Sequence, residues 1–413
     1  MKILKWMAIF ATGFGVAFLW AHFARTPNYD LVLPLQQDVR AYSDDDTIKQ
    51  LPQTFMEHFL SPWVKTEFPD IKVSLAMPYE LMEKQYYDGH GNKYSTQFAQ
   101  YIIDNAIGDT NYENKRGIMI MDADMRAIPS DSPMYSKPSH PTFGHPFDYA
   151  IYSRVRMNTP VMIMNESNDG NYMAVYNHQG GPYWVPSESV RLANDSDFEL
   201  LKNAKYVTPT AEPLYLENGT KVHIGTLFPI QNDKPIRATI DGWQPVNLQS
   251  NMVAKWPMPF SHKSISEIAE SMHSPYAWGG IDGIGRDCSQ LFMEMFIPFG
   301  LYMPRNSRNQ INYFPGIDMN GMSDAEKIEV INTKAIPFET LIYFPGHIML
   351  YIGTDQDGDP LVYHAIWGMR RYTPFFQETR LVIGKTIVSG TQLAERNWIS
   401  MVRRMAFIGP HAE

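Results

Sequence analysis

Short apolar runs separated by turn residues fill the middle of the chain, and they limit its fold more than any other feature. Between residues 116 and 256, runs of β-branched and aromatic residues alternate with Pro, Gly and Asn, which predicts short strands. Asn168-Asp169-Gly170, between two such runs, is typical of a tight hairpin. The spacing predicts two small β-barrels in tandem, over residues 119–192 and 193–256.

The segment before the barrels has a different pattern. Leu51, Phe55 and Phe59 recur at a spacing near 3.6 residues within the stretch 44–68, and a second apolar face runs from Gln97 to Ala106. This periodicity predicts helices. We therefore expect a helical N-terminal module over residues 30–118.

Residues 1–25 have the composition of an export segment. Lys2 and Lys5 precede an apolar run from Trp6 to Phe23, as in a secretory signal peptide or a single membrane anchor. The run lacks a clean small-residue cleavage site, so both interpretations stay open. Either one predicts an exported or periplasmic protein, with attachment to the inner membrane if the segment is kept.

The overall composition excludes several classes of protein. A net charge of −9 without a Lys/Arg cluster argues against a nucleic-acid partner. The single cysteine, Cys288, rules out an internal disulfide and a cysteine-rich zinc site, and no HxH or HExxH motif is present. We expect neither a metal nor an organic cofactor.

The pattern becomes mixed over residues 257–413. Helices are predicted at 264–272 and 287–299, and strands at 340–344, 347–353, 361–367 and 399–407. Helices followed by an antiparallel sheet indicate an α+β domain. The whole chain is thus predicted to be an α+β multidomain protein.

Cys288 stands at a point where a cysteine could act as a nucleophile. A glycine-rich stretch, 279–285, leads into an apolar helical stripe, and Asp287 is a good N-cap type that places Cys288 in the first turn. The helix dipole there should lower the pKa of the thiol, and the first-turn amides could stabilise an oxyanion. A buried cysteine that acts only as a small apolar residue is the alternative.

Two histidines are candidates for the base that a thiol nucleophile needs. His347 opens one predicted strand and His364 lies in the next. If the strands are neighbours, His347 faces Cys288 as base and then acid, while His364 orients its ring. Each could instead be an ordinary core histidine, but two of them after a helix-capping Cys favour catalysis.

These motifs, in this order, resemble the NlpC/P60 family of papain-like cysteine peptidases. The resemblance is strongest from 275 to 367 and rests on Trp278-Gly279-Gly280, Asp287-Cys288-Ser289, Pro304-Arg305-Asn306-Ser307, 347–353 and His364. It implies an N-terminal stabilising module, two bacterial SH3-like domains and a C-terminal papain-like catalytic domain. Gln290 is a departure, because the family usually has Gly there.

The resemblance also implies a substrate and a set of binding residues. The substrate would be a peptidoglycan muropeptide with a free N-terminal L-Ala, cut by a monomer between γ-D-Glu and a diamino acid such as meso-diaminopimelate. The implied binding residues are Tyr276, Asp287, Ser289 and Ser307, with Asp148 and Tyr183 added from the first barrel. A catalytically weak peptidoglycan-binding protein and an acyltransferase or amidase on the same fold remain alternatives.

Overall fold

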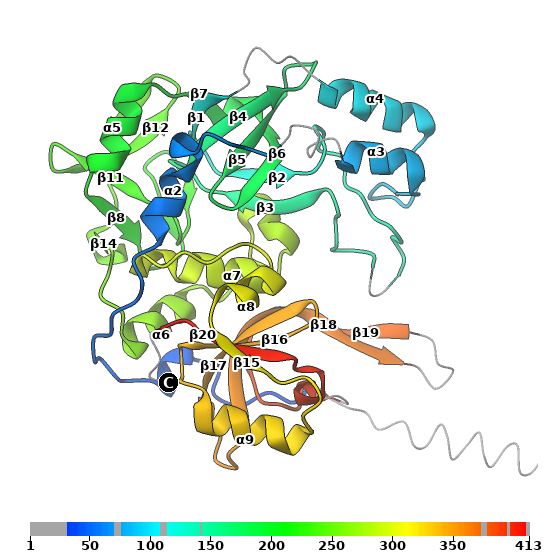
Figure 1. Cartoon of the computed structure of the whole chain (residues 1–413), viewed down its shortest axis with the longest axis vertical. Coiled ribbons are helices and arrows are strands. Elements are labelled where there is room, and N and C mark those ends of the chain that lie inside the picture. The colour runs from blue at the N-terminus through cyan, green and yellow to red at the C-terminus, as the bar shows by residue number, and fades with distance from the viewer. Residues whose placement is uncertain are drawn as a thin grey trace, which may run out of the picture.

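The computed structural model describes residues 31–69, 76–107, 114–140, 143–372, 378–394 and 397–409. The two barrels lie together above the C-terminal domain in Figure 1. The export segment predicted at 1–25 lies outside the described residues. Across the ranges that are described, no helix is both long enough and apolar enough to cross a membrane.

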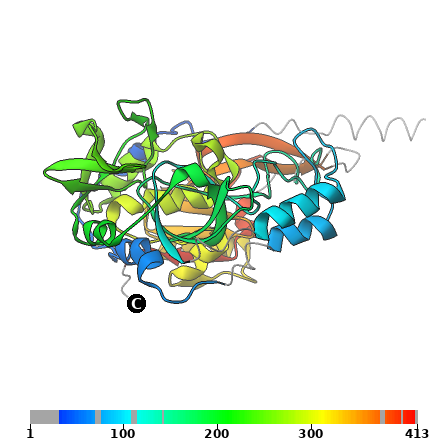
Figure 2. The ribbon, with the colours of Figure 1, turned by 90° about the horizontal axis from the view of Figure 1, so that it is seen from above.

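The described residues of the N-terminal region form three α-helices and one short 3-10 helix. They are η1 (Val39–Tyr42), α2 (Phe55–Val64), α3 (Ala76–Glu83) and α4 (Thr96–Ile107). Figure 2 shows α3 and α4 side by side at one end of the molecule. The helix predicted from residue 44 begins only at Phe55, because Pro52 disfavours helical geometry at the residue before it. The indole of Trp63 on α2 donates to the backbone oxygens of Gly117 and Val161, which holds the helix on the first barrel.

The first barrel is a seven-stranded antiparallel sheet of order β3-β2-β6-β5-β4-β1-β7. Its strands are β1 (Lys115–Met119), β2 (Ala123–Arg126), β3 (Ile151–Val155), β4 (Pro160–Glu166), β5 (Tyr172–Asn177), β6 (Gly180–Pro186) and β7 (Val190–Leu192). The turn at 168–170 joins β4 to β5 as predicted. All but the last residue of β1 lies in the range assigned from sequence to the helical module, yet the strand pairs with β4 and β7.

The second barrel opens with a helix that the sequence analysis did not predict. Helix α5 (Asp195–Asn203) begins at a capping box between Asn194 and Asp197. A five-stranded sheet follows, of order β13-β12-β11-β8-β14, with a separate two-stranded ladder β10-β9. The strands are β8 (Tyr206–Pro209), β9 (Leu214–Tyr215), β10 (Lys221–Val222), β11 (Phe228–Gln231), β12 (Lys234–Thr239), β13 (Gly242–Pro245) and β14 (Val253–Trp256).

The C-terminal domain has the α+β organisation predicted for it. Its helices are α6 (His262–Ser271), α7 (Cys288–Met295), α8 (Ser307–Tyr313) and α9 (Asp324–Lys334), and the 3-10 segment η6 (Trp278–Gly283) precedes α7. A six-stranded antiparallel sheet has the order β15-β20-β16-β17-β18-β19. Its strands are β15 (Gly316–Asp318), β16 (Thr340–Phe344), β17 (His347–Thr354), β18 (Pro360–Tyr372), β19 (Glu378–Ser389) and β20 (Arg404–Phe407).

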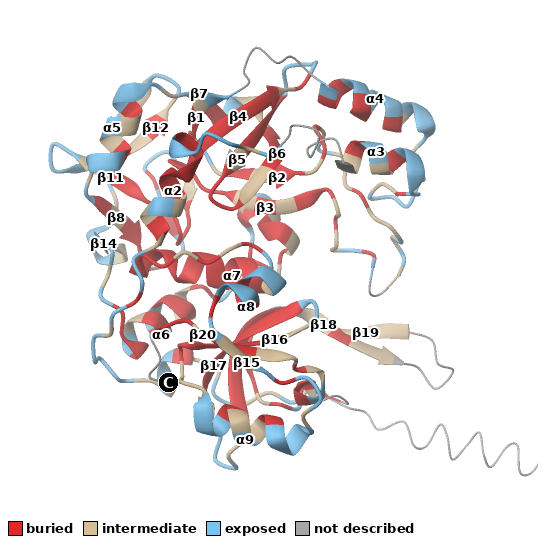
Figure 3. Cartoon of the chain, viewed as in Figure 1, coloured by how far each residue is buried: buried red, intermediate tan, exposed pale blue. Residues whose placement is uncertain are grey.

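Helix α7 is the most deeply placed element of this domain. All eight of its residues are buried, and Figure 3 shows it lying between the barrels and the six-stranded sheet. It packs on β17 and β18 on one side. A helix enclosed in this way cannot move without disturbing the barrels above it.

Candidate active site

Cys288 is the first residue of α7, and Asp287 caps that helix as predicted. One carboxylate oxygen of Asp287, Oδ1, accepts hydrogen bonds from the backbone amides of Ser289 (3.1 Å) and Gln290 (2.9 Å). These bonds satisfy two donors that the helix itself leaves unpaired. The cap fixes the start of α7 and therefore the direction in which the Cys288 side chain leaves it.

The thiol of Cys288 does not have the lowered pKa that we expected from the helix dipole. Burial raises the pKa of Cys288 to about 12, and the neighbouring carboxylate of Asp287 adds to this rise. Hydrogen bonding from the backbone at Ile348 and Ser289 acts in the opposite direction but is weaker. The expectation is wrong because burial and the neighbouring carboxylate destabilise the thiolate more than the helix dipole stabilises it.

His347 and His364 come together on adjacent strands, as the sequence predicted. His347 Nε2 lies 2.7 Å from His364 Nδ1, and His364 Nε2 lies 3.1 Å from the hydroxyl of Ser389 on β19. If each Nε2 carries the proton, His347 donates to His364 and His364 donates to Ser389. That arrangement leaves His347 Nδ1 as an unprotonated base.

The electrostatics keep this histidine pair neutral. Burial lowers the pKa of His347 to about 4, although the Asp287 carboxylate partly opposes the shift. Burial also lowers the pKa of His364 well below its usual value, and the neighbouring His347 contributes to that shift. The resting site therefore holds a neutral thiol at the start of α7 and a neutral imidazole at the start of β17, the strand that packs on α7. A proton must pass between them when the thiol reacts.

Arg305 organises the opposite side of the cysteine, a role that sequence reasoning missed. Its guanidinium pairs with Asp287 Oδ2 and with the hydroxyl of Ser289, and its Nε donates to the hydroxyl of Ser153 on β3 at 3.0 Å. Asp287 Oδ2 also accepts from the amide of Gly279 at 3.0 Å. Both oxygens of Asp287 are thus occupied, and its charge is matched by a buried arginine.

Tyr276 lies beside the nucleophile. Burial raises the pKa of its phenol well above the usual value, and the proximity of Cys288 and Asp287 raises it further. The phenol consequently stays protonated and can donate a hydrogen bond near the thiol. The sequence offered this residue as a binding group, and its position also suits a donor to an oxyanion.

The remaining predicted residues lie at different depths around the site. Ser307 is the first residue of α8 and is half-buried. Tyr183 on β6 stacks on Tyr152 of β3, with ring centroids 3.9 Å apart, and Arg305 influences the pKa of both phenols. These two tyrosines therefore bring the first barrel up to the Arg305 side of the cysteine.

Asp148 reaches the site through its backbone rather than its carboxylate. Its Oδ1 accepts from the amides of Met134 (2.7 Å) and Ala150 (2.8 Å), which ties together the connection between β2 and β3. Its carbonyl oxygen accepts from the indole of Trp278 at 2.9 Å. Asp148 thus attaches the first barrel to the loop before the nucleophile.

Gln290, the departure from the family pattern, points away from the reacting thiol. Its side chain is fully buried and donates to Glu294 at 3.0 Å. It fills the space under Gly280, where a Cβ would lie 2.2 Å from the Gln290 side-chain oxygen. Gln290 therefore supports the loop above α7 from below.

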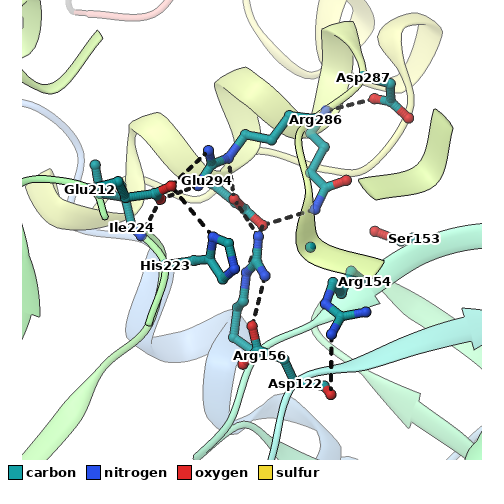
Figure 4. A network of polar contacts seen from close by, with 12 residues as sticks. Asp122, Ser153, Arg154, Arg156, Glu212, His223, Ile224, Arg286, Asp287 and Glu294 are labelled. Atoms are coloured by element: carbon teal, nitrogen blue, oxygen red, sulfur yellow. Dashed lines mark hydrogen bonds and ion pairs between the residues drawn. The ribbon is translucent and has the colours of Figure 1, made fainter. Parts of the chain in front are cut away.

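A buried network of charges links both barrels to α7 (Figure 4). Glu294 lies between Arg156 of the first barrel and Arg286, the second residue before Cys288. Arg286 also pairs with Glu212 of the second barrel, and Arg156 with Asp122 at 2.7 Å. The two arginines hold the pKa of Glu294 at about 2, although burial alone would raise it. Through this network both barrels fix the approach to the nucleophile.

No metal site emerges from the described side chains: among them, no three or more His, Cys, Asp or Glu residues are grouped so as to hold an ion. The arrangement that does exist is a thiol, a base, an orienting histidine and a protonated phenol. Together these groups can carry out acyl transfer through a covalent intermediate.

Comparison with known proteins supports this description. Residues 273–376 match the NlpC/P60 family, and residues 133–186 match the SH3 domain of the SH3b1 type. No curated protein matches the chain.

Solved structures show where the fold recurs. One described as a novel NlpC/P60 endopeptidase from Photobacterium damselae subsp. piscicida has a TM-score of 0.83 at 22% identity, covering 94% of this chain and all of that one. An NlpC/P60 family protein from Bacillus cereus ATCC 10987 has a TM-score of 0.51 at 14% identity, covering 72% of this chain and all of that one. At these identities the likeness concerns the fold alone.

Proposed function

We propose that this chain is a cell-wall cysteine peptidase that cleaves the γ-D-glutamyl–meso-diaminopimelate bond of muropeptides, and the match of residues 273–376 to the NlpC/P60 family supports this class. The observation that carries the proposal is the 2.7 Å contact between His347 and His364 on strands that pack against the helix of Cys288. This arrangement supplies a base whose ring orientation is fixed. Hydrolysis through a thioester requires such a base.

The first half of the reaction forms the thioester. His347 Nδ1 takes the proton from Cys288 as the sulfur attacks the γ-carbonyl carbon, and the carbonyl oxygen becomes an oxyanion. The phenol of Tyr276 and the first-turn amides of α7 are placed to donate to that oxygen. The C–N bond then breaks, and His347 returns the proton to the departing amine.

The second half regenerates the enzyme. His347 removes a proton from water, which attacks the thioester carbon, and the carbon–sulfur bond breaks. The glutamyl product leaves as a carboxylic acid, and the sulfur recovers its proton from His347. His364 keeps the ring in one tautomer throughout, because it accepts from Nε2 of His347.

We propose that the enzyme selects a free N-terminal L-Ala by steric exclusion of longer substrates, and not through an ion pair with the ammonium group. Asp287 is an unsuitable anchor for an ammonium group because Arg305 and three backbone amides already hold its oxygens. The Tyr152–Tyr183 stack and the Ser153–Arg305 contact bring the first barrel against the site instead. A substrate extended past its L-Ala would meet this wall.

The export segment predicted at 1–25 indicates the compartment in which we propose that the enzyme acts. An exported enzyme would meet peptidoglycan fragments or the intact wall in the periplasm. Its SH3-like domains offer further contact with stem peptides.

A paired-substrate assay tests the proposal. The full chain is incubated with L-Ala-γ-D-Glu-meso-diaminopimelate and with its N-acetylmuramoyl form, and released dipeptide is measured by mass spectrometry. We expect cleavage of the free tripeptide, slower cleavage of the acylated form, and no turnover by the Cys288→Ala variant. If Cys288→Ala retained activity, the thioester route would be refuted.

The same assay separates the two alternatives. An acyltransferase would give a dipeptide amide when an amine is added, instead of the free acid. A peptidoglycan-binding protein without activity would cleave neither substrate while its thiol still reacted with an alkylating reagent.

A further inference from the structure

A cavity of about 620 Å³ adjoins the histidines, and Arg305 is not among the residues that line it. His347, His364 and Tyr276 lie on its wall, whereas Asp287, Ser289 and Ser307 do not. The β18–β19 hairpin forms one side, and the connection between β2 and β3 of the first barrel forms the other through Phe147 and Tyr149. A substrate passing over Cys288 would therefore have one end in this cavity and the other end beside Arg305.

Two arginines of the hairpin line the cavity directly opposite each other. Arg370 on β18 and Arg380 on β19 are register partners in the antiparallel ladder. Like charges in directly opposite positions destabilise a pair of strands. Their placement on the wall of one cavity therefore has a cost that a bound anion would remove.

The partners of these arginines only partly offset that cost. Arg370 Nε lies 3.2 Å from a carboxylate oxygen of Glu378, and the Arg380 guanidinium lies over the ring of Phe147, 5.4 Å from its centroid. Arg380 Nε is buried, and in the described part of the chain it has no hydrogen-bond partner. Arg380 thus lines the cavity with a guanidinium whose hydrogen-bonding capacity is not fully used by the described residues.

The rest of the wall defines what kind of ligand would fit. Trp367, Phe147 and Tyr276 give it aromatic surfaces, and Met369 adds an aliphatic one. Such a wall accommodates a short apolar chain, while guanidinium groups bind carboxylates through paired hydrogen bonds. The cavity is therefore suited to an aliphatic chain that carries a carboxylate.

We infer that this cavity receives the part of the substrate on the amine side of the cleaved bond, and that Arg370 and Arg380 bind a carboxylate of that part. The inference rests on the proposed function, because it assigns the glutamyl side to the Arg305 end. A diamino acid whose amine has been released still carries at least one carboxylate on an aliphatic chain. An amine-side residue without a carboxylate would offer no negative group for the two arginines to bind.

The test uses the full chain and four variants. Arg370→Gln and Arg380→Gln, singly and together, remove the paired charges, while Arg371→Gln removes the charge at the adjacent position, which is not on the cavity wall. Binding of meso-diaminopimelate is measured by calorimetry against cadaverine, which has the same carbon chain and both amines but no carboxylate. In parallel, kcat/KM is measured for the tripeptide and for its form with amidated diaminopimelate carboxylates.

We expect the double variant to lose about tenfold to a hundredfold in affinity for meso-diaminopimelate, and a similar factor in kcat/KM for the carboxylate substrate. Arg371→Gln, cadaverine and the amidated substrate should show no such dependence. Unchanged preference for the carboxylate substrate in the double variant would overturn the inference. Arginine-dependent binding of meso-diaminopimelate without cleavage of any substrate would uphold the carboxylate site and overturn the proposed function.

Discussion

Glu294, on the helix that begins with the nucleophile, accepts two 2.9 Å hydrogen bonds from the guanidinium group of Arg156 in the first barrel. Both side chains are buried. Arg156 also balances Asp122, so its removal would leave two buried carboxylates with less compensation. The first barrel therefore contributes a buried side chain, Arg156, to the interior around α7.

Arg156→Met should lower the free energy of unfolding by about 3 kcal/mol, because breaking a buried ion pair leaves uncompensated charge. The shift in the urea midpoint measures the loss. Lys84→Met is the matched control, since the Lys84–Glu80 pair is exposed and screened by solvent, so its loss should barely move the midpoint. Equal shifts in the two variants would contradict a role for the network in stability.

The activity should survive to an unusually low pH. As the pH falls through the His347 pKa of about 4, the imidazole takes up a proton and can no longer accept one from the thiol. With the Cys288 pKa raised to about 12, kcat/KM should stay level between about pH 5 and 9. Initial rates on the free tripeptide measure the profile. An acid limb near pH 6.5, the value of a solvated histidine, would show that His347 is hydrated.

Ser389→Ala should lower kcat and leave KM nearly unchanged, because Ser389 meets His364 and only through it affects the base. His364→Ala should have the larger effect, about tenfold or more, since it removes the direct partner of His347. Steady-state kinetics on the tripeptide separates the two constants. Ser400→Ala, at an exposed hydroxyl of a 3-10 turn, is the control. An increase in KM alone would point to a binding role instead.

Tyr183→Ala should reduce the preference for the free N-terminus over the N-acylated substrate, because it opens the barrel wall beside Arg305. The ratio of kcat/KM for the two substrates is the measure. Tyr215→Ala, on an exposed position of the second barrel, should leave the ratio unchanged. If Tyr183→Ala lowered both rates equally, the tyrosine would support the fold and not the selectivity.

Gly280→Ala should destabilise the loop that precedes the nucleophile. Gly280 has φ of +72°, and an added Cβ would strike Gln290. Gly170 has the same φ but open space around it, so Gly170→Ala isolates the backbone cost of about 1–2 kcal/mol. The difference in unfolding free energy between the two variants should be about 1–3 kcal/mol. No difference would mean that Gln290 moves aside without cost.

Much of the fold and of the site could be predicted from local sequence patterns. The hairpin at 168–170, the strand from Thr340 to Phe344 and the Asp287 cap each depend on neighbours in sequence, so periodicity and turn chemistry could predict them. The resemblance to NlpC/P60 proteins is confirmed for the C-terminal domain, and that to SH3-like domains for the first barrel.

What sequence reasoning missed depends on contacts between distant segments. Arg305 lies in a motif that was noticed, but its contact with Ser153 exists only after the first barrel has docked. Ser389 could have been paired with His364 only if the length of the β18–β19 hairpin had been predicted. The sign of the Cys288 pKa shift was wrong for a similar reason, since burial is a tertiary property that outweighed the local helix dipole.

Because Cys288 is the sole thiol of the chain and is 8% exposed, a thiol-specific reagent can mark the site at a single position. Any label attached to it sits at one known position, with no background from other cysteines. The rate at which a maleimide reacts would report how accessible the Cys288 thiol is to solvent. A substrate bound over Cys288 should slow that labelling, so occupancy could be measured without any cleavage.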